Sequence, residues 1–538
     1  MSMLRKVRQT LALVFFVCIT LLFLDFTGTI HAWMGWMAKI QFMPALLSVN
    51  LLVIAVLLLL TFLLGRVYCS VICPLGIMQD IISRINGTRK KMKYRFTYSP
   101  AMTYVRNIVL VIFCASIFLG LGSVVALLSP YSSYGRIASN LLSPVWKFGN
   151  NILAYFAERA DSYAFYETEI WIKTLPTFII AVITFVIIAI LAWRNGRTYC
   201  NTICPVGTIL GYLSRFSLFR IEIDREKCKN CRLCSKQCKS SCIDIKHHKI
   251  DYSRCVACMD CLDSCKHDAI HYVYRYGKSH SVQGPQSEPQ NEPHNDLQND
   301  LPKNSQTNIN ISGNSQKQDM EKKTEGKPVD TSRRNFLTSA VIATVGATVK
   351  AQEMKVDGGL ATIIDKKVPV RNTPIFPPGA LSKKNFLQKC TGCQLCVSVC
   401  PNQVLRPSTD LMRLMQPEVS YEKGYCRPEC TKCSEVCPTG AINLLSMADK
   451  SSTQIGHAVF IMENCVAVTD GVTCGNCARH CPSGAIEMIY SKEGDNKSPQ
   501  IPAINVERCI GCGACENLCP SRPFSAIYVE GHERHRMI

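Results

Sequence analysis

Apolar residues crowd the first 200 positions of this 538-residue chain, where they form four long runs. The runs lie at about residues 10–28, 45–64, 105–128 and 174–193, and each approaches the ~20 residues that a helix needs to cross a bilayer. The second run contains "LLSVNLLVIAVLLLLTFLLG", which has no charge and no polar face. This pattern predicts an all-α unit of four transmembrane helices. The alternative is a set of buried helices in a soluble protein.

Charges in the loops predict how this four-span unit, residues 1–215, is oriented. Arg5, Lys6 and Arg8 precede the first run, and the loop "RINGTRKKMKYR" after the second run is densely basic. The loop after the first run carries a single lysine, and the loop after the third run is mixed in charge. The positive-inside rule therefore places both ends of the unit in the cytoplasm, as in a multi-pass protein of the inner membrane.

A repeated sequence follows the second and the fourth run. "GRVYCSVICPLGIMQDIISR" begins at Gly65, and "GRTYCNTICPVGTILGYLSR" begins at Gly196 and aligns with it without a gap. Each copy carries a C-x3-C-P motif, with Cys69 and Cys73 in the first copy and Cys200 and Cys204 in the second. These thiols either pack as small apolar groups or meet as a redox-active or metal-binding group.

Cysteine spacing predicts iron–sulfur clusters. Most of the 31 cysteines fall in C-x2-C-x2-C-x3-C runs, the pattern of bacterial [4Fe–4S] ferredoxins, which argues against disulfides. The exceptions include Cys18 and Cys114, which stand alone in apolar runs and are interpreted as packing residues.

Two cysteine runs and short β-rich pieces predict a cytoplasmic, α+β ferredoxin-like domain at residues 216–276. In two-cluster ferredoxins the fourth cysteine of each run binds the other cluster, so Cys265 should complete the first cluster and Cys238 the second. A zinc site is the alternative, although zinc modules usually use paired C-x2-C knuckles. The two runs are Cys228, Cys231, Cys234 and Cys238, and Cys255, Cys258, Cys261 and Cys265.

Two further features distinguish this domain. Lys239 and Lys266 follow the fourth cysteines, where ferredoxins usually have proline. Positive charge there favours the reduced cluster and should raise its potential. Cys242 is a spare cysteine, for which a structural role is expected.

Residues 277–330 are polar and nearly free of large apolar side chains, which predicts a disordered linker. Residues 331–352, "TSRRNFLTSAVIATVGATVKAQ", then show the twin-arginine export pattern in the middle of the chain. The site around Ala351 is a poor one for cleavage, so this segment is expected to stay as a short fifth span.

Four more cysteine runs predict a second ferredoxin-like domain at residues 353–538. Its clusters are inserted in the cytoplasm and the domain folds around them. The twin-arginine route carries folded proteins, so the domain should be extracytoplasmic. The prediction is six [4Fe–4S] clusters in all. The four runs are Cys390, Cys393, Cys396 and Cys400; Cys426, Cys430, Cys433 and Cys437; Cys465, Cys474, Cys477 and Cys481; and Cys509, Cys512, Cys515 and Cys519.

The net charge of +20 does not indicate nucleic-acid binding. A [4Fe–4S] cluster with four thiolates has a formal charge of about −2, so six clusters offset about 12 of these charges. Basic loops beside the membrane explain most of the rest. The sequence shows no nucleotide-binding glycine loop, flavin motif or haem C-x2-C-H motif, so it implies no hydride donor.

Residues 1–275 resemble membrane subunits of the NapH/MauN type, which have four spans, two C-x3-C-P motifs and two cytoplasmic clusters. Residues 331–530 resemble periplasmic ferredoxins of the NapG/MauM type. The chain is thus similar to a fusion of two proteins that usually occur separately, as a quinol dehydrogenase for periplasmic nitrate reductase and related systems. In related four-cluster subunits the first run pairs with the fourth, which implies that Cys400 joins the fourth run and Cys519 the first.

The resemblance implies electron transfer from the quinone pool to an extracytoplasmic reductase, in contact with membrane lipid. Asp25 and His31, near the outer end of the first run, are candidate proton acceptors in quinol oxidation. The C-x3-C-P thiols are candidates for a redox role in the same reaction. Two other hypotheses remain open at this point. One is a maturation factor that supplies electrons to a partner metalloenzyme. The other is thiol redox transfer through the C-x3-C-P motifs.

Overall fold

The computed structural model describes residues 3–88, 96–162, 164–276, 365–492, 495 and 497–538. All of these residues belong to the first compact unit of the chain. The predicted linker and twin-arginine segment lie outside the described residues.

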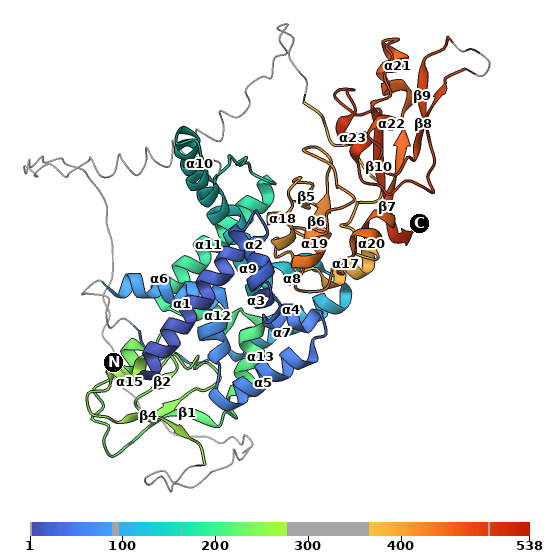
Figure 1. The fold of residues 1–538 in the computed structure, drawn as a ribbon. Coiled ribbons are helices and arrows are strands. Elements are labelled where there is room, and N and C mark those ends of the chain that lie inside the picture. The colour runs from blue at the N-terminus through green and yellow to red at the C-terminus, as the bar shows by residue number, and fades with distance from the viewer. Residues whose placement is uncertain (1–2, 89–95, 163, 277–364, 493–494, 496) are drawn as a thin grey trace, which may run out of the picture. The chain divides into compact units, whose positions relative to one another are not determined.

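The N-terminal part of the first unit is helical (Figure 1). Its elements are α1 (Met3–Leu24), α2 (Thr29–Met34), α3 (Trp36–Lys39), α4 (Phe42–Leu47), α5 (Leu51–Leu64), η1 (Tyr68–Ile72), α6 (Pro74–Gly87), α7 (Thr103–Leu119), α8 (Gly122–Leu128), α9 (Pro130–Ile137), η3 (Ala138–Leu142), α10 (Ser143–Arg159), α11 (Leu175–Asn195), α12 (Thr198–Thr202) and α13 (Pro205–Ser214).

Only part of the predicted four-span unit has full-length helices. Among the described residues, α1 and α11 are long and apolar enough to cross a membrane, whereas α5 and α7 have 14 and 17 residues. The second predicted span is interrupted before α5, where Val49 has a φ of 56° and Asn50 caps the helix. The third is interrupted at Gly120, whose φ of 71° ends α7 in the left-handed conformation. Two of the four predicted continuous spans are therefore broken helices.

The first ferredoxin-like domain is built from short elements that connect the cysteine loops. Strands β1 and β4 pair antiparallel, as do β2 and β3. The elements are β1 (Phe219–Ile223), α14 (Leu233–Gln237), β2 (Ile243–Asp244), β3 (Lys249–Ile250), α15 (Asp260–Ser264) and β4 (Ile270–Tyr274).

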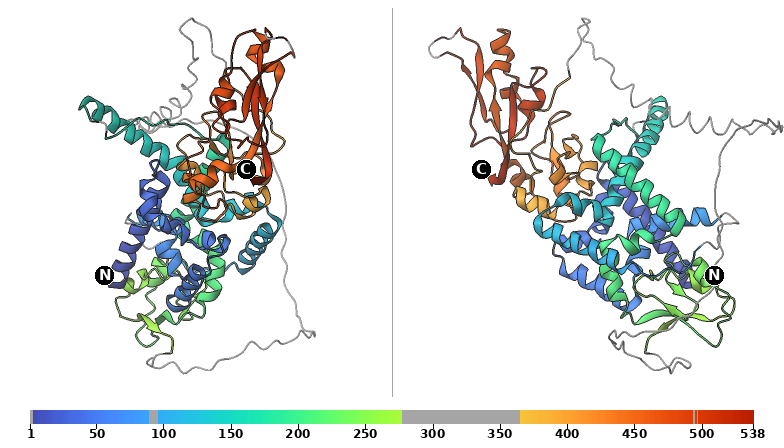
Figure 2. Two further views of the ribbon diagram at one scale, coloured as in Figure 1. Left: turned by 45° about the vertical axis from the view of Figure 1, so that its right-hand side comes forward. Right: turned by 180° about the vertical axis from the view of Figure 1, so that it is seen from behind.

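The described residues of the C-terminal domain form three antiparallel strand pairs, β5 with β6, β8 with β9, and β7 with β10. Figure 2 shows the longer strands of this domain in the red, C-terminal part of the chain. Its elements are α17 (Lys383–Lys389), α18 (Leu395–Ser398), β5 (Leu405–Pro407), η4 (Leu411–Arg413), β6 (Pro417–Val419), α19 (Lys432–Val436), α20 (Met447–Ser452), β7 (Thr453–Phe460), η5 (Met462–Asn464), α21 (Val466–Thr469), α22 (Asn476–Arg479), β8 (Ile486–Tyr490), β9 (Gln500–Ile504), α23 (Ala514–Leu518) and β10 (Ile527–Met537).

The first ferredoxin-like domain contacts one set of helix ends. Arg5, in the first turns of α1, forms ion pairs with two carboxylates of α15. The carbonyl of Leu64, the last residue of α5, accepts a hydrogen bond from Tyr272. Arg106, in the first turn of α7, donates to Ser253.

The C-terminal domain contacts the opposite ends of the same helices. The carbonyl of Thr27, just after α1, accepts a hydrogen bond from Lys432. Lys173, just before α11, donates to the carbonyl of Val397. The short helix α8, which follows α7, contacts η4. The helical bundle therefore has one ferredoxin-like domain at each end.

Candidate functional site

Two small cavities in the first ferredoxin-like domain group its cysteines. One is lined by Cys228, Cys231, Cys234 and Cys265. The other is lined by the three remaining cysteines of the second run together with Cys238 from the first run. This is the crossed arrangement that the sequence predicts, in which each run lends its fourth cysteine to the other cavity.

Backbone conformation explains how consecutive cysteines turn toward one point. Arg232 and Met259, each directly after the second cysteine of its run, have φ values of 60° and 61°. Gln394 and Gly513 hold the same position in two runs of the C-terminal domain, with φ values of 66° and 78°. A non-glycine residue in this conformation is strained, and such strain is typical of functional sites.

Cys242, which the sequence shows only as a cysteine outside the two runs, lies beside the second cavity of this domain. It lines the second cavity, and its sulfur lies 3.5 Å from that of Cys238. The side chain is buried. A fifth thiol therefore lies in hydrogen-bonding contact with a residue of the C-x2-C-x2-C-x3-C pattern, which the sequence alone did not indicate.

The C-terminal domain pairs its runs differently from the related subunits. A cavity lined by Cys509, Cys512 and Cys515 also contains Cys481, the last cysteine of the third run. In return, Cys519 lies near Cys477 of the third run. The third and fourth runs are thus partners in the structure.

The first two runs of this domain are partners in the same way. Cys437 lies beside Cys390 and Cys393, and Cys400 lies beside Cys426 and Cys430. The implied placement of Cys400 with the fourth run and of Cys519 with the first is therefore wrong. Each pair therefore consists of two runs that are adjacent in sequence.

The four C-x3-C-P thiols meet in one buried site between the two repeats. Cys69, Cys73, Cys200 and Cys204 are each 4% exposed and belong to one packed cluster. Burial raises the pKa values of Cys73 and Cys204, and the electrostatic effect of the other three cysteines raises that of Cys204 further. The structure therefore brings together the four residues that the repeat had placed at equivalent positions.

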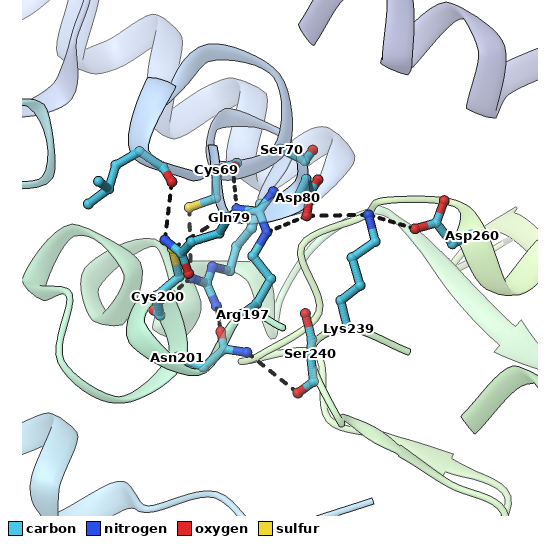
Figure 3. Close-up of polar contacts among 12 residues, drawn as sticks. Cys69, Ser70, Gln79, Asp80, Arg197, Cys200, Asn201, Lys239, Ser240 and Asp260 are labelled. Carbon is cyan, nitrogen blue, oxygen red and sulfur yellow. Dashed lines mark hydrogen bonds and ion pairs between the residues drawn. The ribbon is translucent and has the colours of Figure 1, made fainter. Parts of the chain in front are cut away.

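Arg66 and Arg197 lie on either side of the four-cysteine site and make equivalent contacts in the two repeats. Arg66 donates to the sulfur of Cys69 at 3.7 Å and to the carbonyl of Cys200 at 3.3 Å. Arg197, its equivalent in the second repeat, lies 4.0 Å from the sulfur of Cys200 and 2.7 Å from the carbonyl of Cys69. Both side chains are fully buried. Each arginine thus contacts the sulfur of its own repeat and the backbone of the other. Figure 3 shows Arg197 beside Cys69 and Cys200.

The glycine of each C-P-x-G sequence makes room for the arginine of the other repeat. A Cβ at Gly76 would stand 2.6 Å from Nη1 of Arg197, and one at Gly207 would stand 2.9 Å from Nη2 of Arg66. Each would also approach the carbonyl of Cys69 or Cys200 closer than 3.0 Å. The repeated glycine is therefore required by the close approach of the two repeats.

The repeats differ in the partners of their arginines. Asp80 pairs with Arg197 at 2.8 Å, and also with Arg8 and Lys239, each at 3.3 Å. Burial opposes ionisation of Asp80, but the three cations outweigh it and hold the pKa of this carboxyl well below its usual value. The equivalent of Asp80 in the second repeat is Gly211, so no carboxylate occupies the matching place.

Lys239 anchors the first ferredoxin-like domain to this network. Its ammonium group also pairs with Asp260 at 2.8 Å. Burial lowers its pKa, and Asp80 and Asp260 together raise it above the usual value. The predicted effect of this lysine on a cluster potential is therefore opposed by two carboxylates in direct contact with its charge.

Asp25 and His31 are adjacent, but the aspartate is committed to local structure. Its carboxylate accepts hydrogen bonds from the amides of Thr27, Gly28, Ile30 and His31. Nδ1 of His31 lies 3.2 Å from the same carboxylate. These contacts fix the turn between α1 and α2, which favours a structural role for Asp25 over proton transfer.

Sequence reasoning missed Arg66, Arg197, Gln79 and Asp80. Gln79 donates to the sulfur of Cys200 at 3.2 Å. A signal for the arginines was present, since the same Gly-Arg pair opens both repeats three residues before the first cysteine. No such signal marks Gln79 and Asp80, because neither is repeated.

Within the described residues, no group of three or more His, Cys, Asp or Glu side chains is arranged to hold a single metal ion. An iron–sulfur cluster makes a different demand, because each thiolate bonds a separate iron atom. The cavities with four cysteine sulfurs, drawn from crossed runs, fit that demand by their donor set.

Comparison with known proteins agrees with this donor chemistry. A family described as "4Fe-4S binding domain" matches residues 47–93 and 175–224, one segment in each repeat. A second family, "4Fe-4S dicluster domain", matches residues 389–441, 425–485 and 471–522. No solved structure matches the chain.

Several curated proteins are similar to parts of the chain. An uncharacterized protein of Methanocaldococcus jannaschii is 26% identical over 276 residues, 50% of this chain and 87% of the relative. The methylamine utilization ferredoxin-type protein MauM of Paracoccus denitrificans is 32% identical over 158 residues, 28% of this chain and 69% of the relative. The putative electron transport protein YccM of Escherichia coli is 23% identical over 226 residues, 41% of this chain and 55% of the relative.

The chain is therefore an iron–sulfur electron-transfer protein with ferredoxin-type domains that bind [4Fe–4S] clusters. Through a segment of 158 residues it belongs to the family of ferredoxin-type proteins that includes MauM.

Proposed function

We propose that this protein is a membrane-bound electron-transfer chain that oxidises quinol and passes the electrons through six [4Fe–4S] clusters to an extracytoplasmic reductase. The 24 cysteines of the six runs are the proposed ligands. The first ferredoxin-like domain is cytoplasmic in this proposal, and the C-terminal domain lies on the other side of the membrane.

The observation that carries this proposal is the position of the two ferredoxin-like domains at opposite ends of the same helices. Arg5 of α1 contacts α15, whereas Thr27, beyond the other end of α1, contacts Lys432. A route for electrons through the bundle therefore has iron–sulfur binding domains at both ends. This arrangement does not depend on the segment that carries the twin-arginine pattern.

The outer surfaces of the long helices support a membrane location. Large apolar side chains of α1, α5, α7 and α11 point away from the bundle, and only 22% of the most apolar window of α1 or α11 is buried. A soluble protein rarely exposes so much contiguous apolar surface. Val17, Leu59, Val111 and Ile187 are 45%, 55%, 67% and 50% exposed.

An apolar groove of about 630 Å³ between α5 and α13 is the proposed quinol site. Its volume is in the range of small-molecule sites. Tyr212 supplies a polar group, and its hydroxyl donates to Asn107. One wall of the groove is formed by α13, the helix that begins directly after Cys204. Its lining residues are Leu58, Leu59, Phe62, Ile209, Tyr212, Leu213 and Phe216.

Thiol transfer to a partner is a poorer account of the C-x3-C-P cysteines. Disulfide exchange requires that a partner sulfur reach the attacking thiolate. Each of the four thiols is 4% exposed, and arginines and glutamine cover them. The burial favours a role in electron transfer within the protein.

The test is anaerobic reduction of the purified protein by a water-soluble quinol, followed by bleaching of the cluster absorbance. Leu213→Trp should fill the groove and slow the reduction at least tenfold, while reduction by dithionite stays unchanged. Ile187→Trp, on the outward face of α11, is the matched control and should behave as the wild type. Failure of quinol to reduce the wild-type clusters would contradict the proposal.

A further inference from the structure

We propose that Cys69, Cys73, Cys200 and Cys204 hold an additional iron–sulfur cluster at the junction of the two repeats, separate from the clusters of the ferredoxin-like domains. The four sulfurs come in symmetric pairs and meet in one buried site. The family described as "4Fe-4S binding domain" matches both repeats, although each matched segment contains only two cysteines. One cluster shared by the two segments satisfies both matches with four thiolates.

Charge is the first physical argument for a cluster. Arg66 is fully buried, and among the described residues no carboxylate lies within ion-pair distance of it. Its other partners are the amide of Asn201 and the carbonyls of Ser253 and Cys200. A buried guanidinium without an anion is costly. A cluster with four thiolates carries a charge of about −2 and supplies the missing anion.

The direction of two helices is the second argument. Cys73 precedes α6 and Cys204 precedes α13, each followed by proline in the first turn. The sulfur of Cys204 accepts a hydrogen bond from the amide of Gly207 at 3.3 Å, and that of Cys73 accepts one from the amide of Gly76. Helix N-termini stabilise thiolates and other negative charge. Both N-termini point at the same site and complete a positive cage around it.

The donor set and its spacing favour a cluster over a single ion. The described residues place no three thiols as a single metal ion requires. Four thiolates, with Gln79 and Arg66 as hydrogen-bond donors to sulfur, are the usual surroundings of an iron–sulfur cluster.

The site lies between a cysteine of the first ferredoxin-like domain and a cysteine of the C-terminal domain. Toward the first domain, Arg66 lies near Cys255, which lines the second inner cavity. Toward the C-terminal domain, Tyr199 directly precedes Cys200, and Arg136 interacts with both Tyr199 and Cys393. A cluster here would relay electrons between the two domains.

The electron balance is simple. An iron–sulfur cluster in one domain gives one electron to the bridging cluster, which gives one electron to a cluster in the other domain. No covalent bond is broken and no proton is transferred. This relay uses the proposed ferredoxin clusters as its partners but does not depend on quinol as the donor.

The first test locates iron directly. A map of the anaerobically purified full chain, measured by iron anomalous scattering or electron microscopy, should show metal density enclosed by the four sulfurs. Cys73→Ser with Cys204→Ser should lose two irons per chain for a [2Fe–2S] cluster or four for a [4Fe–4S] cluster. Cys18→Ser with Cys114→Ser is the control and should keep all iron.

A second test does not require loss of a ligand. Arg66→Gln removes one positive charge beside the cluster, so the reduced form becomes less favourable. The midpoint potential of one redox transition should become more negative by at least 59 mV, which for one electron corresponds to a tenfold change in the equilibrium constant of reduction. Arg66→Lys should restore much of the shift, and the other transitions should not move.

The outcomes separate this inference from the proposed function. Metal in the ferredoxin cavities with bare sulfurs, a disulfide or zinc at the four-cysteine site would overturn the inference alone. Iron at the four-cysteine site with empty ferredoxin cavities would overturn the proposed six clusters instead.

Discussion

Asp80 should be the most important single carboxylate for the stability of the helical bundle. It holds three cations from different parts of the chain, at 2.8 Å for Arg197 and 3.3 Å for both Arg8 and Lys239. The change Asp80→Asn keeps the shape but leaves these buried cations facing a neutral amide. Breaking one buried ion pair costs about 3–5 kcal/mol. We expect a loss in this range, since Lys239 retains Asp260.

The assay is a double-mutant cycle on thermal unfolding in detergent, with Asp80→Asn, Arg197→Gln and both together. Removing the second charge relieves the uncompensated cation, so the double mutant should be more stable than additivity predicts by about 1–3 kcal/mol. Glu533→Gln breaks an exposed ion pair with Lys383 and serves as the control, with an expected change below about 1 kcal/mol. A loss at Asp80 no larger than the control, or strict additivity, would refute the reasoning.

Three further predictions concern other parts of the chain. Gly207→Ala should destabilise the protein by about 1–3 kcal/mol, because the new Cβ meets the carbonyl of Cys200 at 2.2 Å, whereas Gly149→Ala meets nothing within 4 Å; unfolding midpoints that do not differ would disprove this packing. Burial, reinforced by His532, lowers the pKa of His535 to about 4 from 6.5, so its share of stability, at most about 3 kcal/mol, is complete above pH 6.5 and is lost as pH falls toward 4. His535→Gln should remove that share, and identical pH profiles of unfolding for variant and wild type would contradict it. Replacing Arg333 and Arg334 with lysine should leave the C-terminal domain in the cytoplasm, as a reporter fused after Ile538 would show; unchanged export would exclude the twin-arginine route.

The sequence was most informative where chemistry requires fixed spacing. The crossed grouping of Cys238 and Cys265 followed from the run spacing together with the layout of two-cluster ferredoxins, in which the fourth cysteine of each run binds the other cluster. The repeat also predicted that Cys69, Cys73, Cys200 and Cys204 occupy equivalent positions, though not that they meet.

Tertiary contacts were much less predictable. The predicted pairing of the four cysteine runs in the C-terminal domain was taken from related subunits and was wrong. Which runs pair depends on how two runs fold around each other and not on the spacing within a run. The breaks at Val49 and Gly120 lie inside mainly apolar runs, where overall hydrophobicity does not reveal a change in backbone direction. Arg197 and Asp80, which pair across the two repeats, are 117 positions apart in the chain.

The central claim is that electrons pass from one ferredoxin-like domain to the other, across the membrane. The direct measurement uses sealed proteoliposomes that contain the full-length protein and trapped ferricyanide, with an impermeant reductant added outside. We predict reduction of the trapped ferricyanide by the wild type, and its loss in Cys73→Ser with Cys204→Ser. Vesicles with fully loaded ferredoxin-like domains that never reduce the trapped acceptor would contradict the account.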